Sequence, residues 1–173
     1  MDARTASEPT PMKNPTTTER KSDRELVVTR TINAPARIVF EAFAKPELFK
    51  RWWVPKSFGL TLLSCELDVR VGGTYRLVFS HFGSEPMAFF GRYIEVTPHS
   101  RLVWTNDEGG DGGAVSTATF EERAGKTLLV MHDLYPSKEA LDAAIASGST
   151  SGMGETLDQL DELVVTLVAS AGR

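Results

Sequence analysis

The C-terminal stretch Gly152–Ala169 most constrains the fold, because its apolar residues recur at the spacing of an α-helix. The apolar stripe of this predicted amphipathic helix consists of Met153, Leu157, Leu160, Val164 and Leu167. Asp158, Asp161 and Glu162 lie off the stripe and are expected to face solvent. A helix of this length needs a large apolar surface to cover, and we expect the chain from Leu26 to Leu134 to supply it as a sheet.

Seven β segments are predicted before this helix, because short runs rich in β-branched or alternating apolar residues are separated by turn signals. The segments are Glu25–Asn33, Leu60–Val69, Thr74–His81, Met87–Val96, Arg101–Asn106, Val115–Glu122 and Thr127–Leu134. The glycine cluster Gly109–Gly113 predicts a flexible hairpin between two of them. Short connections between successive segments favour antiparallel pairing.

Prolines predict two short helices between the first and second β segments. Pro35 is suited to the first turn of one helix, and Pro46 to the first turn of the next. Ser137 can cap a further helix through about Ala146, and the Gly/Ser-rich stretch at 147–152 predicts a break or loop. The resulting order predicts an α+β helix-grip fold, in which a seven-stranded curved antiparallel sheet wraps around the long C-terminal helix. Such a grip can leave a cavity between its layers.

Composition narrows the expected organisation and partners. Residues 1–23 are Thr, Pro, Ser and charged residues, which predicts a disordered tail before a single domain at 24–170. The net charge of −4 gives no basic footprint, so we expect no nucleic-acid partner. Cys65 is the single cysteine, no apolar run is long enough for a membrane span, and no signal peptide is evident, so a cytoplasmic protein is expected.

Several segments together resemble one protein superfamily. They are NAPARIVFEAFAKPELFKRWW, VGGTYRLVF, FFGRYIEVTPHSRLVWTN, STATFEE, TLLVMHD and GMGETLDQLDELV. In this order they are similar to the START-like (Bet v 1-like, or SRPBCC) superfamily, and most similar to its branch named after the C-terminal domain of the activator of Hsp90 ATPase. The resemblance covers about residues 24–169 and implies the helix-grip fold. It does not imply one activity, because the superfamily includes lipid and hormone carriers, polyketide cyclases and a co-chaperone module.

The candidate cavity residues are those expected between the sheet and the C-terminal helix. They are Trp52, Trp53, Tyr75, Leu77, Phe79, Tyr93, Trp104, His132, Met153, Leu157, Leu160 and Val164. The two adjacent tryptophans can cover the cavity mouth or plug one end of the core, and the two roles are compatible if one ring points in and the other out. By alternation, His132 shares a strand face with apolar neighbours, where a hydrogen-bonded core histidine is the simpler interpretation.

Three functions remain open from the sequence. The first is a module that binds a small hydrophobic or aromatic ligand. The second is a protein-interaction module, either a homodimer or an Hsp90-type cofactor, with Trp52, Phe58 or Phe82 as contacts. Because the co-chaperone has a separate N-terminal Hsp90-binding domain, for which 173 residues are not expected to leave room, direct Hsp90 activation is not the first expectation.

The third function is an enzyme of the cyclase or hydratase type. No pair of residues stands out by spacing, and His132, Tyr93 and Glu95 are the first candidates for proton transfer. No cofactor or metal is expected, because neither the three histidines nor Cys65 has a partner at metal-ligand spacing.

Overall fold

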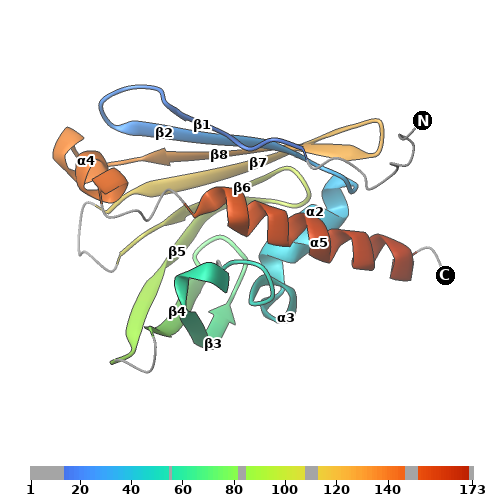
Figure 1. Ribbon diagram of the computed structural model, residues 1–173, viewed down its shortest axis with the longest axis horizontal. Coiled ribbons are helices and arrows are strands. Elements are labelled where there is room, and N and C mark those ends of the chain that lie inside the picture. The colour runs from blue at the N-terminus through green and yellow to red at the C-terminus, as the bar shows by residue number, and fades with distance from the viewer. Residues whose placement is uncertain (1–13, 55, 82–84, 108–112, 147–151, 172–173) are drawn as a thin grey trace, which may run out of the picture.

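The computed structural model describes residues 14–54, 56–81, 85–107, 113–146 and 152–171 (Figure 1). The strands are β1 (Thr17–Arg20), β2 (Glu25–Ile32), β3 (Leu60–Leu67), β4 (Thr74–His81), β5 (Met87–Thr97), β6 (Arg101–Thr105), β7 (Val115–Arg123) and β8 (Lys126–Leu134). The helices are α2 (Ala36–Ala44), α3 (Pro46–Phe49), the 3-10 turn η1 (Lys56–Phe58), α4 (Lys138–Ala146) and α5 (Met153–Ala171). The predicted hairpin at 109–113 and the predicted break at 147–152 lie largely outside the described residues.

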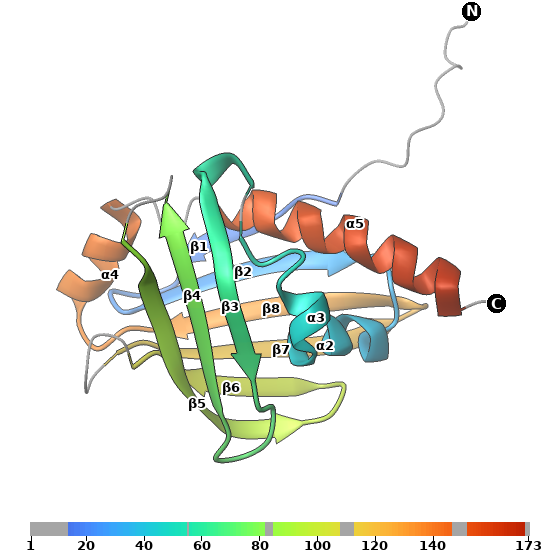
Figure 2. The same cartoon turned by 90° about the horizontal axis from the view of Figure 1, so that it is seen from below.

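The strands form one antiparallel sheet with the order β1-β2-β8-β7-β6-β5-β4-β3. Figure 2 shows β3 and β4 running across the direction of β7 and β8, so the sheet curves strongly around the space beside α5. The register shifts within the β5–β6 pair, between Tyr93 and Glu95, as expected for a bulge that bends a strand. The predicted helix-grip architecture is therefore confirmed.

Gly91 lets β5 pass close to β6 and to the side chain of Tyr75. A Cβ atom at this position would lie 2.0 Å from the Thr105 carbonyl oxygen and 2.8 Å from a ring carbon of Tyr75. Both distances are shorter than van der Waals contact, so no larger residue fits here without movement of the backbone.

The sheet has eight strands rather than the predicted seven, because β1 lies within the segment that we expected to be a disordered tail. Its four residues, TTER, contain no apolar side chain and are all exposed, so hydrophobic patterning gives no signal for it. It pairs along the edge of β2, and Arg20 forms an ion pair of 2.7 Å with Asp142 of α4. The prediction of disorder is therefore wrong for Thr17–Arg20, and residues 1–13 lie outside the described residues.

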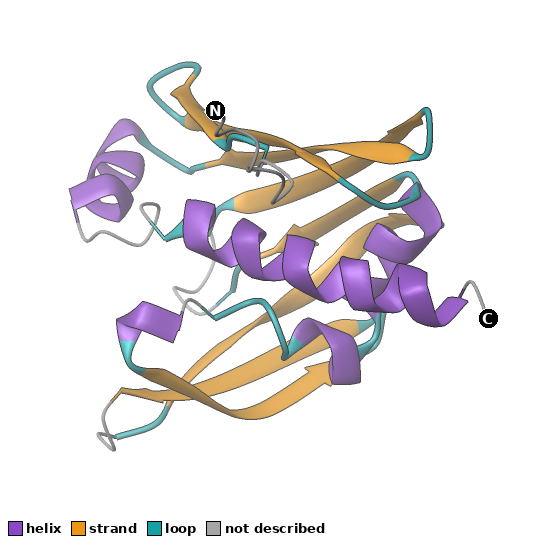
Figure 3. Ribbon diagram, turned by 45° about the vertical axis from the view of Figure 1, so that its right-hand side comes forward, coloured by secondary structure: helices purple, strands orange, loops and turns teal. Residues whose placement is uncertain are grey.

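Helix α5 lies across the concave side of the sheet, and α2 crosses beneath it (Figure 3). Leu157, Leu160 and Val164 of the predicted stripe are fully buried. Asp158 and Asp161 do not simply face solvent as predicted. Both carboxylates bind the buried guanidinium of Arg30 on β2, at 2.6 Å and 2.5 Å, and this contact fixes the helix to the sheet. In the described part of the chain, no helix combines the length and apolar character needed to cross a membrane.

Candidate functional site

Two adjoining cavities lie on the concave side of the sheet. The outer cavity has a volume of about 450 Å³, and the inner cavity about 70 Å³. They share four lining residues, which are Trp53, Phe89, Trp104 and Asn106. The outer volume lies within the range of roughly 300–1,000 Å³ that is typical of small-molecule sites.

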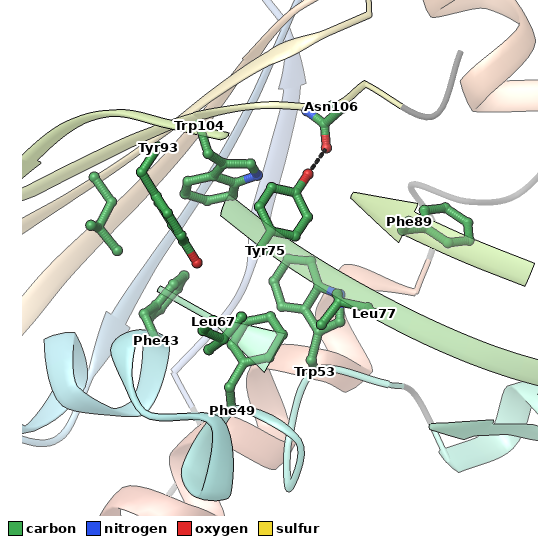
Figure 4. A pocket seen from close by; sticks show the side chains of 11 residues that line it. Phe43, Phe49, Trp53, Leu67, Tyr75, Leu77, Phe89, Tyr93, Trp104 and Asn106 are labelled. Carbon is green, nitrogen blue, oxygen red and sulfur yellow. Dashed lines mark hydrogen bonds between the residues drawn. The ribbon is translucent and has the colours of Figure 1, made fainter. Parts of the chain in front are cut away.

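The inner cavity is largely aromatic. Figure 4 shows Phe43, Phe49 and Trp53 facing Tyr75 and Tyr93 across it. Tyr93 is 5% exposed, and burial raises the pKa of its phenol well above the ordinary value. Within the described residues, no hydrogen-bond partner meets its hydroxyl. A buried hydroxyl without a partner is costly, so this group offers a bound molecule a polar contact.

A chain of hydrogen bonds runs from the inner cavity along the wall of the outer one. The Tyr75 hydroxyl lies 2.7 Å from the Thr105 carbonyl oxygen and 3.2 Å from Oδ1 of Asn106 (Figure 4). Nδ2 of Asn106 donates to Oγ of Ser116 over 3.0 Å. Ser116 in turn lies directly across from Asp133 on β8, and its hydroxyl lowers the pKa of the Asp133 carboxyl. The largely apolar wall thus carries a row of three neighbouring polar side chains, Asn106, Ser116 and Asp133.

Asp133 is the acidic end of this row. Its cross-strand neighbours are Leu26 on β2 and Ser116 on β7, and all three line the outer cavity. Burial raises the pKa of the Asp133 carboxyl, while the Ser116 hydrogen bond and the charge of His132 oppose that rise. Nearby, burial and the charge of Asp133 raise the pKa of Tyr135 to about 12.

Gln159 of α5 fixes the loop that carries Trp53. Its side-chain nitrogen donates to the carbonyls of Trp52 at 2.9 Å and Val54 at 2.8 Å, and its oxygen accepts from the Lys56 amide at 2.9 Å. Because Gln159 satisfies three backbone groups of one loop, the ring of Trp53 stays at the boundary of the two cavities.

Apart from His132, the predicted cavity residues divide into two groups. Those that line one or both cavities are Trp53, Tyr75, Leu77, Tyr93, Trp104 and Met153. The buried residues that line neither cavity are Trp52, Phe79, Leu157, Leu160 and Val164. The structure therefore has a solid core beneath the middle of α5 and open space toward its N-terminal end.

The two tryptophans have separate positions. Trp52 is fully buried, and its indole Nε1 donates to the Ala42 carbonyl oxygen of α2 over 2.9 Å. It plugs the core and offers no surface for the protein contact that we considered for it. Trp53 instead stacks on Phe49 with a centroid distance of 4.8 Å and faces both cavities. Of the other proposed contact residues, Phe58 is half-buried and Phe82 lies outside the described residues.

His132 does not face the cavities, which corrects the prediction. On β8 the buried inner residues are Thr127, Leu129 and Met131, so His132 lies on the outer face. Its Nε2 lies 2.8 Å from a carboxylate oxygen of Glu25, and both side chains are about one-third exposed.

Glu95, another predicted catalytic candidate, also lies outside the cavities. It forms an exposed ion pair of 3.0 Å with Arg101. Of the three candidates, only Tyr93 lines a cavity. No group of three His, Cys, Asp or Glu side chains comes together as a metal site would require, as far as the structure describes the chain.

Asn106, Ser116 and Asp133 were not predicted. Ser116 and Asp133 lie on the neighbouring strands β7 and β8, and Asn106 directly follows β6, so the three converge only when the strand register is known. The sequence offered one signal for Asp133, which is that it shares a strand face with Met131, two residues before it. This signal is weak, because β8 has apolar residues on both of its faces.

Comparison with known proteins places the chain in a family. The profile of the family described as "Activator of Hsp90 ATPase homolog 1-like protein" matches residues 33–165. No curated protein sequence matches the chain significantly.

Solved bacterial structures share its fold. A Rhodobacter sphaeroides protein has 24% identity and a TM-score of 0.80, covering 88% of this chain and 99% of its own. A Nitrosomonas europaea protein has 23% identity and a TM-score of 0.78, with coverages of 87% and 99%. A Chromobacterium violaceum protein has 30% identity and a TM-score of 0.69, with coverages of 83% and 98%. The chain therefore belongs to the activator of Hsp90 ATPase homolog 1-like family, within the START-like superfamily.

Proposed function

We propose that this protein binds a small, largely apolar or aromatic molecule in the two adjoining cavities beside α5. The observation that carries the proposal is the outer cavity of about 450 Å³, whose largely apolar wall carries a row of polar side chains, Asn106, Ser116 and Asp133. Binding sites for small molecules commonly combine an apolar surface for affinity with a few polar groups for orientation.

The aromatic side chains support this proposal. Trp53 and Trp104 are both half-buried and line both cavities, so a bound molecule can replace solvent against two large apolar rings. Within the described residues, neither indole N–H has a hydrogen-bond partner, and each is available to a ligand. The anchoring of the Trp53 loop by Gln159 lowers the ordering cost of binding.

A pair of neighbouring substitutions on α4 tests the proposal. Ala144 lines the outer cavity, whereas Ala143, the preceding residue of the same helix, is exposed. Ala144→Phe should fill part of the cavity, and Ala143→Phe adds the same side chain outside it. We expect the wild type and Ala143→Phe to bind the neutral dye Nile red with equal fluorescence gain, and Ala144→Phe to bind it at least about tenfold more weakly.

Native mass spectrometry of freshly purified protein adds a second measurement. A small-molecule mass that disappears on denaturing extraction, and that is depleted in Ala144→Phe, would identify the natural ligand. If the wild type and Ala144→Phe bind Nile red equally and neither has an adduct, the cavity is not a binding site and the proposal fails.

A further inference from the structure

The charge of the outer cavity is one-sided. Among the described residues, Asp133 is the acidic side chain on its wall, and no lysine, arginine or histidine lines either cavity. His132, the neighbour that acts on Asp133 electrostatically, is on the other face of β8 and pairs with Glu25. A bound carboxylate would therefore meet a like charge and no balancing cation inside the cavity.

The carboxyl of Asp133 has capacity for further hydrogen bonds. A carboxylate offers about four acceptor positions, and the neighbouring donor on the β7 side is the single hydroxyl of Ser116. Two other neighbours of Asp133 on the same face are Leu26, its cross-strand partner on β2, and Met131 of β8. Neither side chain can donate a hydrogen bond. The remaining acceptor positions adjoin the cavity.

The aromatic side chains of the wall also favour a positively charged ligand. Trp53 and Trp104 line the outer cavity together with Asp133, and indole faces attract cations more strongly than other aromatic side chains do. Tyr135, on the same wall, adds a neutral phenol, since its pKa is raised to about 12.

We propose that the outer cavity selects organic amines, with an aromatic or aliphatic body against Trp53 and Trp104 and a protonated amine against Asp133. This inference rests on the proposed function above and narrows it to one class of ligand. It also means that fatty acids and other organic anions are poor ligands for this chain.

Three compounds with the same apolar body test the inference by isothermal titration calorimetry at neutral pH. Tryptamine, tryptophol and indolepropionate share an indole ring and a two-carbon linker, but end in an ammonium, a hydroxyl and a carboxylate. We expect tryptamine to bind roughly 10- to 100-fold more tightly than tryptophol, because hydrogen bonds between charged groups contribute more than neutral ones, and indolepropionate to bind most weakly.

Two variants assign the preference to one residue. Asp133→Asn should lower the affinity for tryptamine to that for tryptophol and leave the affinity for tryptophol nearly unchanged. Glu162→Gln, which removes the same charge from an exposed position of α5, should keep the wild-type order. The order of the three compounds on the wild type is a test that does not require any variant to fold.

The outcomes separate the inference from the proposed function. If tryptophol or indolepropionate binds the wild type as tightly as tryptamine, or if Asp133→Asn keeps the preference for tryptamine, the cavity binds ligands but the selection of amines is wrong. If none of the three binds while Nile red does, the inference alone is overturned. If Nile red also fails to bind, the proposed function fails with it.

Discussion

At the residue scale, the Asp133 carboxyl lowers the stability of the folded protein when it ionises, because it lies in a largely apolar wall. Burial raises the pKa of this carboxyl, so the folded protein holds the proton more tightly than the unfolded chain does. Below the unfolded pKa, near 3.8, both states are protonated and the penalty is absent. As pH rises through the folded pKa, the penalty grows to its full value. The wild type therefore loses stability from this group as the pH rises from the unfolded pKa through the folded pKa.

Asp133→Asn should remove this pH-dependent penalty, because an amide does not ionise. We expect the variant to have a higher Tm than the wild type at neutral pH and a difference that shrinks as the pH falls toward 3, measured by differential scanning calorimetry. Among the described residues, the ionisable groups that act on Asp133 or feel its charge are Tyr135 and His132, and the pair of His132 with Glu25 is on the outer face in both proteins. A variant that is less stable than the wild type at neutral pH would show that the carboxylate is not penalised.

His132 and Asp133 also show why the sequence predicted the fold better than the site. The apolar residues Leu128, Leu129, Val130 and Met131 occupy both parities of β8, so alternation cannot decide which face is inward. A shift of one residue exchanges the two faces. The predicted parity places His132 on the inner face, whereas the structure has Asp133 on that face and His132 on the outer one. Local pattern was informative on β4, where Arg76 separates buried Tyr75 and Leu77.

At the scale of elements, α5 is held by charge as well as by its apolar stripe. The Arg30 side chain is 1% exposed, and it binds Asp158 and Asp161 of the helix and Thr16 ahead of β1. The sequence could not reveal this contact, because the two carboxylates lie off the apolar stripe and their partner is far away in the chain. Loss of the buried guanidinium would leave two carboxylates without compensation.

Arg30→Met should therefore lower the free energy of unfolding by about 3 kcal/mol, as measured by urea denaturation. The matched control is Arg101→Met, because Arg101 and Glu95 form an ion pair in which both side chains are nearly half exposed. Loss of that exposed pair should cost less than about 1 kcal/mol. Equal losses in the two variants would contradict the assignment of Arg30 as the anchor of α5.

At the scale of the whole molecule, the open sheet has two edges, formed by β1 and β3. β1 covers the edge of β2 with polar residues, and unprotected strand edges are sites of association between molecules. Because β1 buries no apolar side chain, its contribution comes from pairing and polar contacts. It is the part of the fold that hydrophobic patterning is least able to predict.

Removal of residues 1–21 tests this role of β1. The truncation deletes the pairing of β1 with β2, the hydrogen bond of Thr16 to the Arg30 guanidinium and the exposed ion pair of Arg20 with Asp142. A hydrogen bond to a charged group contributes about 1.5–3 kcal/mol and an exposed pair less than about 1 kcal/mol, so we expect a loss of at least roughly 2 kcal/mol, to which the lost pairing adds. Sedimentation velocity should also detect association that the full chain does not show, because the edge of β2 is then uncovered. Removal of residues 1–13 leaves β1 intact and serves as the control. If removal of residues 1–13 destabilises the protein as much as removal of residues 1–21, the loss of stability is not due to β1.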